Sequence, residues 1–142
     1  MKSTAASIQI LSWEQAQAWA YPVRLEVFVK EQGVPKELEL DEDDPLAWHA
    51  VAELDALIIG TARLQKNGKV GRMAVMQAYR RQGVASAMMN ALLKFGQQHG
   101  IKEFYLHAQI EALPFYERFG FVANGPVFNE AGIAHQIMKR AT

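Results

Sequence analysis

The chain has 142 residues, half of them hydrophobic, which is enough for one domain with a sizeable core and excludes a disordered chain. Its 15 lysine and arginine residues balance 15 aspartate and glutamate residues, so no overall basic charge favours nucleic acid as a partner. The absence of cysteine excludes disulfides, thiolate metal sites and a cysteine nucleophile. With no secretory signal and no run of about 20 apolar residues, we expect one cytoplasmic domain over residues 1–142, without a membrane partner.

The amino-terminal part is predicted to contain a short strand and an interrupted helix. Residues 8–11 are a strand candidate, and Ser12 with Gln15 forms a capping-box pattern at a helix start. The helix is expected to reach about Lys30 as two pieces, because Pro22 breaks or kinks a helix near residues 20–21.

Residues 31–45 carry seven acidic side chains with Gly33 and two prolines, which predicts a loop. The acidic residues are Glu31, Glu37, Glu39, Asp41, Glu42, Asp43 and Asp44. One interpretation is a solvated loop, and another is an acidic rim that attracts a cationic acceptor such as an amine. No glycine lies in the middle of the acidic run, so the spacing does not match a calcium-binding loop.

The middle of the chain predicts three antiparallel strands in a row. Residues 48–54 and 57–64 are joined by a turn at Asp55 and Ala56, and Asn67-Gly68 is a hairpin turn that leads into a strand over residues 69–75. An amphipathic helix from about Ala85 and a strand over 103–109 follow, which favours a right-handed parallel crossover. A helix over 111–119 and a last strand near 134–139 complete an α/β (α+β) architecture. We expect a mixed, mostly antiparallel sheet with helices on both faces.

The loop after residue 75 is the first candidate for a binding site. It joins a strand to a helix and contains Arg80, Arg81 and Gly83. The first N–H groups of a helix have no partner within the helix, and the helix dipole adds partial positive charge there. Such an end binds phosphate well, so the loop predicts a site for a phosphate-bearing cofactor.

Two motifs in this chain resemble those of the GCN5-related N-acetyltransferase (GNAT) superfamily. Residues 80–85, RRQGVA, are similar to its R/Q-x-x-G-x-G/A pyrophosphate loop, with Ala85 at the last small position. Residues 112–121, ALPFYERFGF, are similar to its A-x-x-F-Y-x-x-x-G-F segment, in the expected order and at a sensible spacing. Further stretches at 26–35, 49, 107–109 and 132–135 resemble a poorly characterised bacterial subgroup, which supplies no substrate. The resemblance implies the acyl-CoA N-acyltransferase fold and acetyl transfer from acetyl-CoA to an amine.

The resemblance also implies a set of cofactor contacts. Backbone groups of Met73, Ala74 and Val75 would hold the pantetheine arm like another strand. The N–H groups expected to bind the pyrophosphate belong to Arg81, Gln82, Gly83, Val84, Ala85 and Ser86. Arg80 and Arg81 would add charge-assisted hydrogen bonds or reach the 3′-phosphate. Gln109 stands where the family often has asparagine, so its amide contact with the cofactor arm needs a longer reach.

Tyr116 matches the family tyrosine that protonates or hydrogen-bonds the departing thiolate; the alternative is a half-buried aromatic side chain. The oxyanion of the tetrahedral intermediate would be stabilised by a strand N–H near Val75. A base, directly or through water, must take the amine proton, and the candidates are His107, Glu26, Glu31, His49 and His135. We favour His107, because histidine titrates near neutral pH and this one lies on a strand beside the cofactor strand. A hydrogen-bonded structural histidine is the alternative for His107.

The acceptor stays open between a small metabolite, a polyamine-like cation and a protein amine. Arg63 and Arg72 would bind an acidic group of the acceptor or form salt bridges with the acidic loop. A CoA-binding sensor without turnover is the rival function, whereas a P-loop protein is disfavoured because G-x-x-x-x-G-K-[ST] is absent. We expect no metal, and dimers are common among proteins of this fold.

Overall fold

The computed structural model describes residues 6–38 and 40–142, and its centre is one seven-stranded sheet in the order β1-β2-β3-β4-β5-β7-β6. The strands are β1 (Ser7–Ser12), β2 (Trp48–Leu54), β3 (Leu57–Leu64), β4 (Lys69–Val75), β5 (Glu103–Gln109), β6 (Val122–Glu130) and β7 (Ile133–Ala141). Neighbouring strands are antiparallel except β4 and β5, which are parallel. The predicted mixed α/β sheet and the parallel crossover are therefore confirmed.

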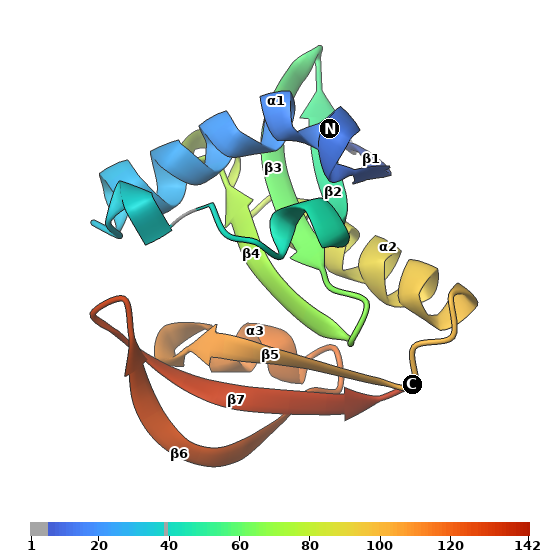
Figure 1. Ribbon diagram of the computed structural model, residues 1–142, viewed down its shortest axis with the longest axis vertical. Helices are drawn as coiled ribbons and strands as arrows, with labels where there is room; N and C mark the ends of the chain where they lie inside the picture. Colours follow the sequence, from blue (N-terminus) through green and yellow to red (C-terminus); the bar gives the residue numbers. More distant parts are fainter. Residues whose placement is uncertain (1–5, 39) are drawn as a thin grey trace.

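Helices cover both faces of this sheet (Figure 1). They are α1 (Trp13–Arg24), which continues as the π-helix η1 (Leu25–Glu31), then α2 (Val84–Gln98) and α3 (Leu113–Glu117). Four short 3-10 turns complete the described structure: η2 (Lys36–Leu38), η3 (Asp44–Leu46), η4 (Gln77–Tyr79) and η5 (Ile110–Ala112). No helix in the described ranges is long and apolar enough to cross a membrane.

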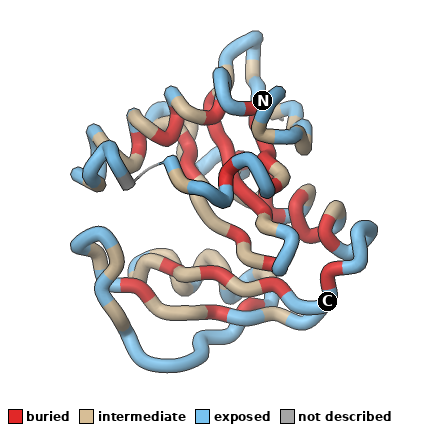
Figure 2. Tube along the Cα trace, in the orientation of Figure 1, coloured by how far each residue is buried: buried red, intermediate tan, exposed pale blue. Residues whose placement is uncertain are grey.

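The core lies mainly between α2 and the sheet, where Met88 and Leu92 pack among buried residues such as Ala62 and Leu64. On the opposite face, Ala16 and Ala20 of α1 form a smaller cluster with Val51, and a third cluster joins Val23 and Val27 to Ala74 of β4. Figure 2 shows burial concentrated in the central strands, while β6 is exposed along most of its length.

The expected break at Pro22 is wrong in its position. Ser12 caps α1 as predicted, its side chain accepting the N–H of Gln15 at 3.3 Å, and the helix then runs through Pro22 to Arg24. It widens only at Leu25 into the π-helix, where the N–H of Gln32 reaches back five residues to the carbonyl of Val27 at 3.1 Å. Proline removes one N–H donor from a helix. The helix continues past Pro22, and its hydrogen-bond pattern changes three residues later. π-helical turns of this kind are frequent at functional sites.

The carboxyl-terminal hairpin extends beyond the prediction. Strand β6 was not expected, because Asn124, Gly125 and Pro126 interrupt any strand pattern. In the structure these residues form an irregular stretch where the β6–β7 register shifts between Asn124 and Phe128. An exposed edge strand tolerates this, since an unpaired backbone group there reaches water. The hairpin closes at Ala131 and Gly132, both in the left-handed region.

Candidate active site

The sheet opens between its two parallel strands. Strands β4 and β5 pair only at Lys69 with Tyr105 and at Val70 with Leu106, and they diverge beyond these positions (Figure 1). Two cavities lie along this opening, of about 550 Å³ and about 470 Å³. We name the first the loop cavity, after the loop residues 79–81 and 83–86 in its wall, and the second the histidine cavity, after His107 and His135. The two cavities share Gln32, Met73 and Tyr116, so two ligands could meet there.

A β-bulge in β4 shapes the wall common to both cavities. Arg63 pairs with Gly71 and Thr61 pairs with Ala74, so the single residue Ala62 faces both Arg72 and Met73. Arg72 adopts a left-handed φ of 49°, a conformation that costs an L-residue about 1–2 kcal/mol. Bulges disrupt the local ladder and redirect side chains, and they are over-represented beside active sites. Backbone groups at the bulge are therefore placed to serve a ligand.

The loop cavity contains the helix start at which the sequence predicts an anion site. Gly83, with a φ of 84°, is the N-cap of the 15-residue helix α2 and provides no side-chain cap. The N–H groups of the first helical turn consequently have no partner within the helix. The predicted cofactor residues that line this cavity are Met73, Ala74, Val75, Arg80, Arg81, Gly83, Val84, Ala85 and Ser86.

Two predicted cofactor residues lie elsewhere. The exposed side chain of Gln82 does not line the loop cavity. Gln109 lines the histidine cavity, and its amide donates a hydrogen bond of 3.0 Å to the side-chain oxygen of Gln32. This bond links β5 to the end of the π-helix beside the junction of the cavities.

Arg80 fixes the loop rather than extending into solvent. Its Nε donates to the carbonyl of Val75 at 2.9 Å, and both terminal nitrogens bind the carboxylate of Glu31 at 2.6 Å. The hydrogen bond from Arg80 lowers the pKa of Glu31. Glu31 is therefore engaged as the ion-pair partner of Arg80, and it lines neither cavity.

Tyr116 lies at the junction of the two cavities, on the short helix α3. Its side chain is half-buried and packs edge-on against Phe115 and Phe121. Desolvation raises the pKa of Tyr116 to about 12. The phenol therefore keeps its proton at neutral pH and is available as a hydrogen-bond donor to both cavities.

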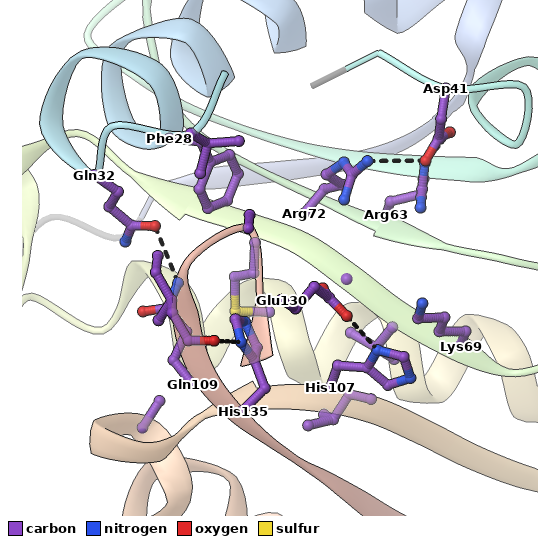
Figure 3. Close-up of a pocket in the computed structure, with 18 of the residues that line it drawn as sticks. Phe28, Gln32, Asp41, Arg63, Lys69, Arg72, His107, Gln109, Glu130 and His135 are labelled. Carbon is purple, nitrogen blue, oxygen red and sulfur yellow. Dashed lines mark hydrogen bonds and ion pairs between the residues drawn. The ribbon is translucent and has the colours of Figure 1, made fainter. Parts of the chain in front are cut away.

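The histidine cavity contains a histidine–carboxylate pair (Figure 3). Nδ1 of His107, on β5, lies 2.8 Å from Oε1 of Glu130, at the end of β6. Partial burial raises the pKa of Glu130, but the hydrogen bond and charge of His107, together with His135 and Lys69, outweigh this and lower it. A carboxylate at Nδ1 directs the other ring nitrogen, Nε2, to act as the proton acceptor. His107 thus has the arrangement of an oriented base.

Arginines bind part of the acidic loop, so a solvated loop is the wrong interpretation for Asp41 and Asp44. Asp44 is 1% exposed and bonds Arg24 through both carboxylate oxygens at 3.0 Å, and Arg63 at 3.0 Å. Asp41 bridges Arg63 at 2.7 Å and Arg72 at 2.8 Å. The predicted salt bridges of Arg63 and Arg72 are therefore present, and both arginines also line the histidine cavity. Glu39 lies outside the described residues.

The other candidate bases differ in position. Glu26 is exposed and pairs with Lys30 at 3.6 Å on the helix surface, and it lines neither cavity. His49 is buried, and its Nε2 donates to the carbonyl of Asp44 at 2.9 Å. Burial lowers the pKa of His49, which packs against Trp13 and lines neither cavity. His135 lines the histidine cavity, with Nδ1 2.7 Å from the carbonyl of Ile133. Across residues 6–38 and 40–142 no cluster of three potential metal ligands occurs.

Glu130, Lys69 and Gln32 are cavity residues that the sequence did not single out. Glu130 was missed because β6 was missed. The turn residues Ala131 and Gly132 were the available signal. A two-residue hairpin there places Glu130 opposite Ile133, with only strand β7 between β6 and β5. Burial lowers the pKa of Lys69, which reaches this cavity from the paired end of β4.

Comparison with known proteins identifies the family. Residues 11–142 match the family model described as the acetyltransferase (GNAT) domain. The chain belongs to the GNAT acetyltransferases. It is 40% identical over 125 residues to the uncharacterized N-acetyltransferase YjcF of Bacillus subtilis, covering 84% of this chain and 89% of that relative.

Solved structures agree with this GNAT assignment. An acyl-CoA N-acyltransferase from Pseudomonas aeruginosa superposes with a TM-score of 0.87 at 28% identity, covering 96% of this chain and 100% of that one. Escherichia coli ElaA gives a TM-score of 0.86 at 28% identity, covering 95% and 99%. The family, the acyltransferase fold and the enzyme class expected from the two motifs are confirmed. This GNAT protein is an acetyltransferase-family enzyme that uses a CoA thioester as acyl donor.

Proposed function

We propose that this enzyme, as one catalytic domain over residues 1–142, transfers an acetyl group from acetyl-CoA to the primary amine of a small acceptor by direct attack on the thioester. The observation that carries the proposal is the meeting of two cavities at Tyr116 and Met73. One cavity contains an uncapped helix start, which would bind an anion, and the other contains a histidine hydrogen-bonded to a carboxylate. These are the separate requirements of a CoA donor and an amine acceptor.

The donor would occupy the loop cavity. Its pyrophosphate would accept hydrogen bonds from the N–H groups at the start of α2, where Gly83 leaves no side chain in the way. Its pantetheine arm would follow Met73, Ala74 and Val75, which line the same cavity. This direction brings the thioester to the bulge and to Tyr116.

The transfer begins when the amine nitrogen attacks the thioester carbon and forms the new C–N bond. Backbone N–H groups at the bulge, beside Met73, would stabilise the resulting oxyanion. Nε2 of His107, directly or through one water, accepts the amine proton and later releases it to solvent. Collapse of the intermediate breaks the C–S bond, yielding the amide and CoA thiolate.

Tyr116 would serve the departing thiolate as a hydrogen-bond donor. Its pKa of about 12 is above the value of about 8.5 typical of a thiol, so full proton transfer from the phenol to the thiolate is uphill. The hydrogen bond stabilises the developing negative charge on sulfur, and the thiolate then takes its proton from solvent. CoA thus leaves as the free thiol.

Thiol release measured with acetyl-CoA and a panel of primary amines tests this proposal. We expect amine-dependent release and an acetylated amine product detectable by mass spectrometry. Calorimetric binding of acetyl-CoA is measured in parallel. Tight acetyl-CoA binding without thiol release from any amine would instead favour a CoA-binding sensor.

A further inference from the structure

Charge in the histidine cavity is balanced. Its lining contains three cationic side chains and three carboxylates: Lys69, Arg63, Arg72, Asp41, Asp43 and Glu130. Behind this wall, Arg24 and Asp44 form a further buried pair. With both histidines neutral, the formal charges of these eight groups cancel. A polycationic amine would face three cations, and a polyanion would face three carboxylates, so the balance favours an acceptor without net charge.

The charged groups lie on two opposite sides of the cavity, and each side carries both signs (Figure 3). Arg63 and Arg72 lie with Asp41 on the side formed by β3, β4 and the acidic loop, whereas His107, Glu130 and Lys69 lie toward β5 and the β6–β7 hairpin. An acceptor with an ammonium that meets Glu130 and an anionic group that meets the arginines could pair with both sides.

The bulge gives Arg72 its place on this wall. Val70 packs in the core on the α2 side of the sheet, so strict alternation along β4 would direct residue 72 to that same side. The extra residue in the bulge instead lets Arg72 reach Asp41 and the histidine cavity. Backbone strain of this kind clusters at functional sites. Arg72 also immediately precedes Met73, which lines both cavities, so its backbone lies beside the place proposed for the thioester.

Asp41 demonstrates that this wall can hold a carboxylate. One of its oxygens binds Arg63 and the other binds Arg72. In addition, Nε of Arg63 is the only buried side-chain donor or acceptor in the described residues without a hydrogen-bond partner. An unsatisfied buried donor requires an explanation, and an anionic ligand is one such partner.

We propose that the acceptor is a small zwitterion of the amino acid type, whose amine faces His107 and whose carboxylate binds Arg72. This inference rests on the proposed acetyl transfer. The acceptor carboxylate joins Asp41 at the Arg72 guanidinium or replaces it, and guanidinium geometry suits bidentate binding of a carboxylate. Glu130 and His107 attract the ammonium, and His107 then accepts its proton.

The test compares matched acceptors in thiol release by the wild-type enzyme with acetyl-CoA. A panel of α- and β-amino acids is paired with the corresponding primary amides, which remove the charge and keep the shape. The amide makes the neighbouring amine less basic and so more available as the free base, which favours the amide. We nevertheless expect kcat/KM to be about 10- to 100-fold higher for the preferred amino acid than for its amide, as expected for a charged hydrogen bond.

Variants identify the group that reads the carboxylate. Arg72→Gln should bring the acid-to-amide ratio of kcat/KM close to one, whereas Arg140→Gln on β7, outside both cavities, should preserve it. Arg72→Lys keeps the charge but loses the planar fork, and an intermediate ratio is expected. The wild-type ratio alone decides the proposal if Arg72→Gln does not fold.

Two outcomes overturn the proposal in distinguishable ways. Equal use of acids and amides by the wild type overturns the zwitterionic acceptor while acetyl transfer to amines stands. Acetyl-CoA binding without thiol release from any member of either series overturns acetyl transfer and, with it, the acceptor inference.

Discussion

The loop cavity and the histidine cavity differ in the chemical groups that are available to bind a ligand. The proposed donor contacts in the loop cavity are mainly backbone groups, which come from a strand end, a helix start and a glycine at a φ of 84°. The histidine cavity uses charged side chains from the acidic loop, β3, β4, β5 and the β6–β7 hairpin. A backbone site keeps its chemistry when most side chains change, whereas a site made of paired charges depends on each partner. Donor binding and acceptor binding should therefore respond to different substitutions.

The largest expected effect is a loss of folding stability, caused by a substitution behind the histidine cavity. Asp44→Asn removes a buried carboxylate that pairs with Arg24 and Arg63 behind the histidine cavity. Two buried guanidinium groups each lose an ion-pair partner, so we expect a loss of about 3–5 kcal/mol in the free energy of unfolding. Urea denaturation at pH 7 measures this loss, with Asp55→Asn in an exposed turn as the control. A loss below about 1 kcal/mol would contradict the structural role of the network.

The same variant makes a prediction about pH. Burial raises the pKa of Asp44, but its hydrogen bonds and charge interaction with Arg24, the N–H of Asp41 and Arg63 outweigh this and lower it below the ordinary 3.8. A carboxyl group whose pKa is lowered by folding stabilises the protein above its unfolded pKa, and this stabilisation is lost as the pH falls through the folded pKa. The stability difference between the wild type and Asp44→Asn should therefore shrink below about pH 4, as denaturation at pH 7 and pH 3 can show.

A second substitution should weaken donor binding in the loop cavity and leave the histidine cavity unchanged. Gly83→Glu adds a side chain at a left-handed φ and places a carboxylate at the proposed pyrophosphate site. We expect acetyl-CoA affinity to fall about 100-fold, equivalent to about 2.7 kcal/mol, by calorimetry. The control is Gly125→Glu, which has a similar φ of 91° and equally open surroundings but lies on β6 outside both cavities. Normal CoA binding by Gly83→Glu would remove the loop from donor recognition.

The same contrast between backbone groups and charged side chains explains which parts of the candidate site could be predicted from the sequence. Most of the residues that line the loop cavity come from one continuous segment, residues 73–86, in which strand, glycine-containing loop and helix follow directly. The local sequence pattern was therefore enough to predict this part of the site. Asp44 and Arg24 are 20 residues apart and Glu130 and His107 are 23 apart, and no local pattern shows which distant charges pair. Pro22 was misplaced as a break because local propensity does not include the packing of Ala20 and Val23 in the core on either side of it.

The third substitution concerns Tyr116, one of the three residues that line both cavities. Tyr116→Phe keeps the ring and its packing while removing the hydrogen-bond donor to the thiolate. We expect kcat to fall about 30- to 100-fold, with acetyl-CoA affinity within about threefold of the wild type. Tyr105→Phe is the matched control, because its hydroxyl accepts a bond from Asn67 and lies outside both cavities. Equal losses in turnover and in affinity would make Tyr116 a binding residue rather than a catalytic one.

The smallest expected effect tests whether catalysis depends on the negative charge that Glu130 places beside His107. Glu130→Gln keeps the side-chain length and a hydrogen bond to His107 but removes the negative charge. We expect kcat to fall about tenfold, within the range seen when a partner that orients a base is altered. Glu53→Gln, on the exposed face of β2, is the control. A merely structural Glu130 would lower the melting temperature and leave the kcat of the folded enzyme unchanged, whereas loss of an orienting carboxylate lowers kcat while the enzyme stays folded.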